Sequence, residues 1–208
     1  MKNNISSLRP LLITVGLAFV LWFITFSVPF GNFWIKISIS ASFLAICALR
    51  MKEANELTMK FNFKAIFIGL VSAVILYAIF WIGQTVSHMI FSFSKSQIDT
   101  VYALGKGSSM GAIALMLLFI TGPAEEIYWR GFVQKRLSNR FGDWQGWLIA
   151  AAIYAGVHIC TLNFMLVGAA GVAGLFWGWL YWRLDNLAPV IISHAVWSAG
   201  IFVVFPTA

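Results

Sequence analysis

The chain has 208 residues, of which 61% are hydrophobic and only 10% are charged. A soluble domain carries about 25% charged residues, so this composition excludes a water-soluble globular protein. The formal net charge of +7 does not indicate nucleic-acid binding, because the basic residues lie in short segments between long apolar runs. We therefore expect an all-α, multi-pass protein that lies in a lipid bilayer and binds no nucleic acid.

A membrane-spanning helix needs about 20 mostly apolar residues. The sequence predicts about seven such helices, of which the fifth is short. In chain order they are Leu11–Phe30, Phe33–Leu49, Ala65–Phe93, Gly111–Phe132, Trp147–Cys160, Phe164–Leu180 and Leu187–Val204. No linker or internal repeat divides the chain, so we expect a single integral membrane domain over residues 1–208.

The distribution of basic residues predicts how these spans are oriented. With the N-terminus in the cytoplasm, ten lysines and arginines fall on the cytoplasmic side, and only Lys95 and Lys106 fall on the other side. Cytoplasmic segments of membrane proteins carry such an excess of positive charge. We therefore expect a cytoplasmic N-terminus and a C-terminus on the opposite side.

Few charged groups lie inside the predicted spans, and these are candidates for a functional site. Placing a charge there costs about 2.5–3.5 kcal/mol on insertion scales. Of the seven acidic residues only Glu125 and Glu126 lie within a span. Glu126 and Arg130 are four residues apart and can pair on one helix face. Glu125 points about 100° away, so it needs a partner on another helix or a water.

All three histidines also lie within predicted spans. His88 is near the end of its span, and we assign it a structural role. His158 shares a helix face with Tyr154, and His194 shares one with Ser198. A carboxylate and a histidine on neighbouring helices can hold and deprotonate a water. These residues alone are consistent with either hydrolysis or proton-coupled transport.

The polar residues form three motifs that resemble those of the CPBP family of intramembrane proteases, which is named for CAAX proteases and bacteriocin-processing enzymes. The family's E-E-x-x-x-R motif is complete at Glu125–Arg130. Its F-x-x-x-H motif corresponds to Tyr154 and His158, with tyrosine in place of phenylalanine. Its H-x-x-x-N motif corresponds to His194 and Ser198, with serine in place of asparagine.

The resemblance covers residues 111–204 and implies an enzyme that hydrolyses a peptide bond within the membrane. In the family, the first glutamate and the histidine of the second motif activate a water, which assigns that role to Glu125 and His158. The third motif stabilises the oxyanion, which assigns that role to His194 and Ser198. The catalytic residues are thus expected among the last four spans.

The remaining motif residues are expected to support the catalytic ones: Glu126, Arg130 and Tyr154. We expect Arg130 to orient Glu126. The H-E-x-x-H zinc motif is absent and one acid is already engaged by arginine, so we expect a glutamate-type peptidase without a cofactor. The alternative is a catalytic zinc, because a glutamate and two histidines form a ligand set that zinc accepts. Its ligands would be Glu125, His158 and His194.

The expected substrate is a membrane-anchored peptide or protein, either CAAX-like and prenylated or of the leader type. We expect a bacterial cytoplasmic membrane as the location and a site that opens to the cytoplasmic half of the bilayer. Two other functions stay open. One is a proton-coupled transporter that uses Glu125 as its proton site. The other is a catalytically silent immunity or binding protein of the same fold, for which the serine at position 198 is an argument.

The depths of the candidate residues present one difficulty. At about 1.5 Å of rise per residue, Glu125 and His194 lie in the inner half of the membrane, whereas His158 lies nearer its middle. These groups can meet only if the helices tilt or if the fifth helix is shifted along its axis.

Overall fold

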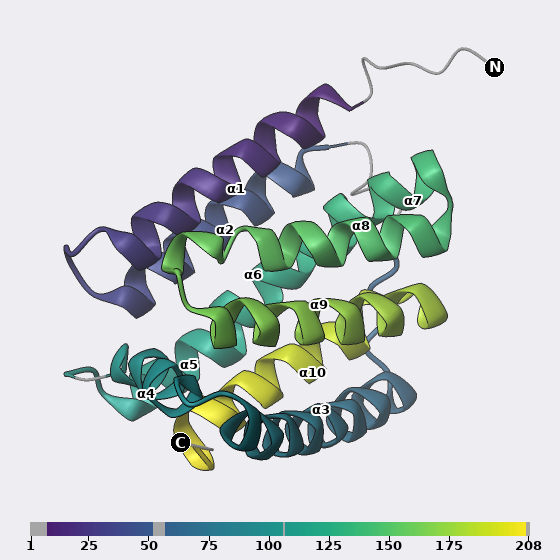
Figure 1. Ribbon diagram of the computed structural model, residues 1–208. Coiled ribbons are helices and arrows are strands. Elements are labelled where there is room, and N and C mark those ends of the chain that lie inside the picture. The colour runs from purple at the N-terminus through teal and green to yellow at the C-terminus, as the bar shows by residue number, and fades with distance from the viewer. Residues whose placement is uncertain (1–7, 52–56, 106, 207–208) are drawn as a thin grey trace.

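A computed structural model describes residues 8–51, 57–105 and 107–206. Throughout these ranges the regular secondary structure is helical, so the predicted all-α fold is confirmed. Figure 1 shows a helical bundle in which the described part of the chain starts at one end and finishes at the opposite end. The helices are α1 (Arg9–Ser27), α2 (Phe33–Leu49), α3 (Phe63–Ile90), α4 (Ser94–Ala103), α5 (Met110–Met116), α6 (Gly122–Glu126), α7 (Lys135–Phe141), α8 (Asp143–Gly156), α9 (Phe164–Leu184) and α10 (Leu187–Ala199).

Short segments of other helix types connect some of these elements. Two π-helical segments lie on either side of α6 and join α5 to α7 in one continuous helix, and a third extends α10. They are η3 (Leu117–Thr121), η4 (Ile127–Gln134) and η6 (Gly200–Val204). A 3-10 turn, η5 (Ile159–Thr161), follows α8.

Five of the described helical segments are long and apolar enough to cross a membrane. They are α1, α3, Met110–Phe141, α9 and Leu187–Val204, and α2 is a shorter apolar helix. The prediction of an integral membrane bundle is confirmed, but the count of seven spans is not. The predicted span Trp147–Cys160 corresponds to α8, which has 14 residues and ends at Gly156. A helix of this length falls short of the roughly 20 residues that a span needs.

Asparagine side chains fix where four of the helices begin. Asn32, Asn62, Asn163 and Asn186 each accept hydrogen bonds from backbone N–H groups in the first turn of α2, α3, α9 and α10. The first turn of a helix leaves such donors without intrahelical partners, and asparagine at the cap satisfies them. These caps also mark the chain reversals between the predicted spans.

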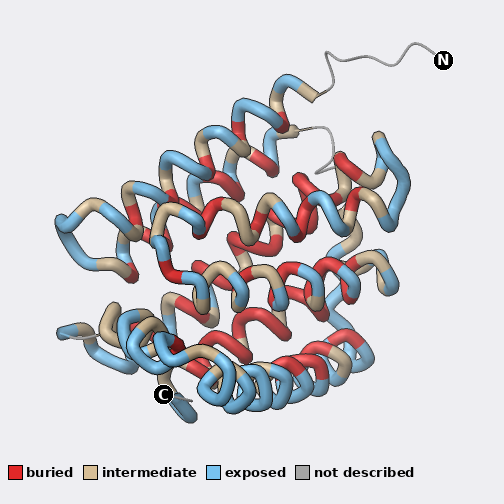
Figure 2. The backbone as a smooth tube through the Cα atoms, viewed as in Figure 1, coloured by how far each residue is buried: buried red, intermediate tan, exposed pale blue. Residues whose placement is uncertain are grey.

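The helix α10 lies at the centre of the bundle. Eleven of its 13 residues are buried, whereas α1 and α3 expose large apolar side chains on their outer faces. Figure 2 shows the exposed residues on the outer faces of α1 and α3. Apolar outer faces of this kind suit a lipid environment. The residues that α10 carries, His194 and Ser198, are therefore held in the interior.

Glycines allow the helices around α10 to approach closely. A Cβ atom added to Gly122 would lie 3.0 Å from Ala195 Cα, and one added to Gly69 would lie 2.7 Å from the Ile192 side chain. On α9, a Cβ atom at Gly174 would lie 3.1 Å from the Tyr154 ring. Small residues at helix contacts are the usual means of close packing in lipid.

The two ends of the bundle differ in charge. Among the described residues, Arg9, Arg50, Lys64, Arg140 and Arg183 belong to the end at which α1 begins. The other end, which holds α4 and the turn between α1 and α2, carries Lys36 and Lys95. This arrangement agrees with the charge asymmetry read from the sequence. The cytoplasmic location of the N-terminus stays a prediction.

Candidate active site

The two glutamates lie on α6, between two π-helical segments. The backbone N–H of Gly122 donates to the carbonyl of Leu117, five residues earlier, and Pro123 contributes no N–H at all. Single-turn π segments inside α-helices occur frequently at functional sites. The helix type therefore changes on each side of α6.

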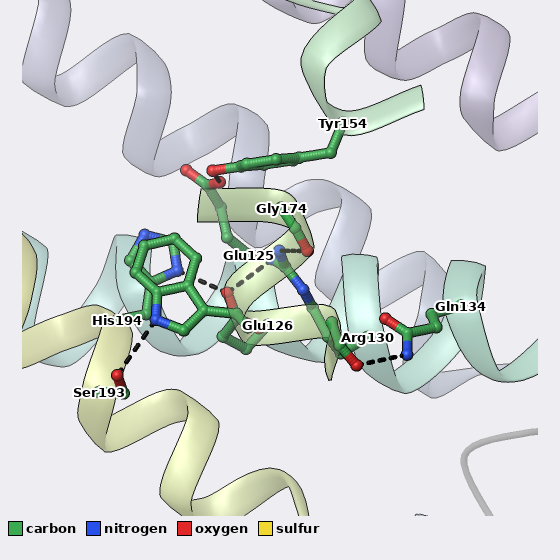
Figure 3. Close-up of polar contacts among 10 residues, drawn as sticks. Glu125, Glu126, Arg130, Gln134, Tyr154, Gly174, Ser193 and His194 are labelled. Carbon is green, nitrogen blue, oxygen red and sulfur yellow. Dashed lines mark hydrogen bonds and ion pairs between the residues drawn. The ribbon is translucent and has the colours of Figure 1, made fainter. Parts of the chain in front are cut away.

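Glu126 contacts two nitrogen-bearing side chains from different parts of the bundle. Its Oε1 accepts a hydrogen bond from Arg130 Nη1 at 2.8 Å and contacts His194 Nδ1 at 2.6 Å. Figure 3 shows Glu126 between Arg130 and His194. Glu126 is fully buried and Arg130 is 2% exposed, so this pair is removed from solvent. The Glu126–Arg130 pairing expected from the four-residue spacing is present, and the contact to His194 extends it to α10.

The guanidinium group of Arg130 also binds α9. Its Nη2 donates to the carbonyl of Gly174 at 3.3 Å, and Gln134, one turn further along, donates to the carbonyl of Gly178 at 2.8 Å. A Cβ atom at Gly178 would lie 2.7 Å from the Trp147 ring. Gly174 and Gly178 therefore allow α9 to pack closely against its neighbours. Close approach also brings both carbonyls within reach of buried donors.

Trp177, which was not predicted from the sequence, stacks against the ring of His194. The two rings stack with their centroids 3.9 Å apart and an interplanar angle of 17°, and the indole N–H of Trp177 donates to Ser193 Oγ at 3.1 Å. Since His194 Nδ1 faces Glu126, only Nε2 is left to act in the cavity described below. No sequence signal distinguishes Trp177 from the other nine tryptophans of the chain.

Glu125 has its hydrogen-bond partner on another helix, as expected. The phenol of Tyr154 on α8 donates to Glu125 Oε2 at 3.0 Å, and both residues are buried. Phenylalanine, which the family motif has at this position, could not donate this bond. Across the described part of the chain, the other carboxylate oxygen, Oε1, has no hydrogen bond. Glu125 therefore keeps one oxygen available for a ligand.

His158 lies in the turn that follows α8, beside Tyr154. Its Nδ1 is 2.8 Å from the carbonyl oxygen of Tyr154, and its Nε2 accepts a hydrogen bond from the indole of Trp22 at 3.2 Å. Tyr154 thus links Glu125 and His158, which the sequence placed at different depths in the membrane. Its hydroxyl bonds to Glu125 and its backbone carbonyl bonds to His158. Both nitrogens of His158 are engaged, however, and neither is directed at Glu125.

Ser198 lies one turn after His194 on α10 and is 3% exposed. Its hydroxyl makes no hydrogen bond to any residue in the described ranges. In particular, it does not bond back to the carbonyl of His194, which is a common use of serine in helices. The hydroxyl is therefore free to donate to a bound molecule.

All four predicted catalytic residues, together with Tyr154, line one cavity of about 440 Å³. A volume of this size is typical of ligand pockets. The predicted catalytic side chains come from the last part of the chain, whereas α1, α2, α3 and α4 supply much of the apolar wall. Aliphatic and aromatic residues make up most of that wall, and the aromatic ones include Phe26, Phe33, Trp34, Phe80, Phe91, Tyr102, Phe164, Trp177, Trp197 and Phe202.

The cavity extends towards the end of the bundle that holds α4. Its lining there includes Ile98 and Val101 of α4 and Phe164 and Met165 at the start of α9. This is the end opposite the start of α1. With the N-terminus in the cytoplasm, the cavity is directed away from the cytoplasm. The expectation of a site open to the cytoplasmic half is not supported by this geometry.

The candidate zinc ligands do not fit a metal site in this arrangement. His158 has a hydrogen bond at each ring nitrogen, and His194 faces Glu126 with one of its two. Within the described ranges no group of three histidine, cysteine or acidic residues is placed to hold a metal ion. We therefore derive no chemical step through zinc.

A carboxylate with one free oxygen, at the wall of an apolar cavity inside a membrane bundle, can hold a water and accept its proton. Residues 106–200 match the family model described as Type II CAAX prenyl endopeptidase Rce1-like. In this segment the chain is similar to the CPBP family, and the resemblance inferred from the three motifs is confirmed. The family is one of proteases, and the matched residues include all four predicted catalytic side chains. Comparisons with curated proteins and with solved structures gave no match.

Removing the Arg130 side chain should destabilise the fold. The Arg130→Ala variant leaves Glu126 as a buried carboxylate without its arginine, which typically costs about 3–5 kcal/mol. Lys135→Ala is the matched control, since it breaks the more exposed ion pair with Asp185 and should cost about 0–1 kcal/mol. Unfolding of both variants in detergent micelles measures the difference. Equal losses of unfolding free energy in the two variants would show that the Arg130–Glu126 pair stabilises the fold no more than an exposed ion pair does.

Proposed function

We propose that this protein is an intramembrane endopeptidase in which Glu125 activates a water for attack on a peptide bond. The observation that carries the proposal is the state of the Glu125 carboxylate. It is buried in the wall of an apolar cavity, Tyr154 fixes one of its oxygens, and the other has no donor within the described part of the chain. A carboxylate in this setting can hold a water and accept its proton.

The reaction then proceeds through a tetrahedral intermediate. Glu125 takes a proton from the water, the hydroxide oxygen adds to the carbonyl carbon, and negative charge develops on the carbonyl oxygen. The donors for that charge are His194 Nε2–H and the hydroxyl of Ser198, which lie one turn apart on the same helix and line the same cavity. When the C–N bond breaks, Glu125 returns its proton to the leaving nitrogen.

Charge balance favours this assignment of roles. With His194 protonated, the four ionisable groups Glu125, Glu126, Arg130 and His194 sum to zero. After proton transfer Glu125 is neutral and the substrate carries the negative charge, so the total stays at zero. A total of zero is favourable in a low-dielectric interior, where an uncompensated charge is costly. The contact between His194 Nδ1 and Glu126 supports the protonated ring.

The cavity suits an apolar, membrane-associated substrate. Its wall is mainly aromatic and aliphatic, and its polar groups are concentrated around Glu125 and His194. We propose that a peptide carrying a lipid group or an apolar segment enters it, either a prenylated CAAX-like protein or a leader-type peptide. The matched family model is named for prenyl endopeptidases, which agrees with the first of these.

Glu125→Gln should abolish cleavage of a membrane-proximal peptide and leave the fold intact. Glutamine has nearly the same shape and still accepts the Tyr154 hydrogen bond, but it cannot accept a proton, so the rate should fall by about 10²–10⁴-fold. Purified variants are compared for cleavage rate and for unfolding temperature. Asp99→Asn, which changes an exposed acid, is the control. Unchanged cleavage with glutamine at position 125 would rule out Glu125 as the base.

Ser198→Ala should lower turnover by about 10²-fold or more with little change in substrate binding, because one oxyanion donor is worth roughly 2.7–4 kcal/mol. Ser198→Asn should restore or raise the rate, since its amide also donates hydrogen bonds. Turnover and binding are measured separately for each variant. An alanine variant with unchanged turnover would remove Ser198 from the site.

A further inference from the structure

The hydrogen bonds of His158 determine which of its nitrogens carries the proton. A backbone carbonyl can only accept, so Nδ1 must carry the hydrogen that it shares with Tyr154. An indole N–H can only donate, so Nε2 must present its lone pair to Trp22. His158 is therefore a neutral ring, protonated at Nδ1, and neither nitrogen is left for a water.

The donor that fixes this state comes from α1. Trp22 is 1% exposed, and its ring meets those of Trp129 and His158 edge to face. The Ser27 hydroxyl at the end of α1 donates to the carbonyl of Cys160, which ties α1 to the turn that holds His158. Trp22 therefore lies in a buried contact inside the bundle.

One partner of this contact, Trp22, lies outside the part of the chain that the family model covers. The match begins at residue 106, whereas Trp22 belongs to the first helix, which carries none of the three motifs. The N-terminal helices thus do more than supply apolar wall. One of them supplies a hydrogen bond to a predicted catalytic residue.

We infer that Trp22 is a positioning residue that holds His158 neutral and turned away from the water, so that Glu125 alone acts as the base. The inference rests on the proposed function and changes the role assigned to His158. A proton on Nε2 would face the indole N–H, which places two donors against each other in a buried site. His158 can accept a proton from water only after the contact with Trp22 opens.

The first arm of the test is spectroscopic and needs no substrate. The chain has three histidines, so ¹⁵N-histidine labelling gives few resonances, and single His88→Asn and His158→Asn variants assign them. In the unmodified protein His158 should show a protonated Nδ1 and a hydrogen-bonded, unprotonated Nε2. A charged His158, or one protonated at Nε2, would overturn the inference, and this result is obtained even if a Trp22 variant fails to fold.

The second arm is the Trp22→Phe variant, which keeps an aromatic ring and loses the N–H. The Nε2 resonance of His158 should move to the position of an unbonded nitrogen. The value of kcat should fall by about tenfold, on the order of one neutral hydrogen bond, with KM within about twofold. The freed Nε2 would then compete with Glu125 for the water.

The matched control is Trp129→Phe. It removes a buried indole next to Trp22 that makes no hydrogen bond within the described residues, so the loss of ring volume is the same. The His158 resonances should not change in this variant. Equal spectral or kinetic effects of the two variants would show that Trp22 acts only through packing. An unchanged or increased kcat in Trp22→Phe would refute the positioning role. If the unmodified protein shows the expected ¹⁵N spectrum of His158 but cleaves no peptide at all, the proposed function is refuted and the inference about His158 is not.

Discussion

The arrangement of the site depends on one carboxylate oxygen, Glu126 Oε1. It meets Arg130 on its own helix and His194 on α10, inside a bundle with apolar outer faces. A buried carboxylate is tolerated there only when cations and hydrogen bonds compensate it. Arg130 in turn binds the carbonyl of Gly174 on α9. The cluster therefore fixes three helices relative to one another, and the cost of burying charge makes that geometry the favourable one.

This constraint leaves Glu125, the neighbouring residue, free to act. A helical step of about 100° turns it away from the cluster and into the cavity. Tyr154 fixes one carboxylate oxygen, and the same residue binds His158 through its backbone. Glu126, in the charged cluster, and Glu125, the proposed base, are thus adjacent in the sequence and differ in what surrounds them.

The sequence predicted those features that depend on residue spacing along a single helix or on a polar residue within an apolar run. The structure shows the predicted Glu126–Arg130 pair and a partner for Glu125 on another helix. It also shows the predicted helix bounds Phe33–Leu49 and Leu187–Val204. The contacts of His194 with Glu126 and of Trp22 with His158 were not predicted, because they depend on the rotation and depth of separate helices. The early end of α8 at Gly156 was also missed, since apolar residues continue beyond it while the backbone turns into a 3-10 segment.

The central claim is that the Glu125 carboxylate, placed by this cluster, hydrolyses peptides within the membrane. The most direct test compares the peptides present in membranes of cells that make the unmodified protein with those of cells that make the Glu125→Gln variant at equal abundance. The account predicts fragments, cut within or next to an apolar or lipid-bearing segment, that occur only with the unmodified protein. Identical peptide sets in the two membranes would contradict it.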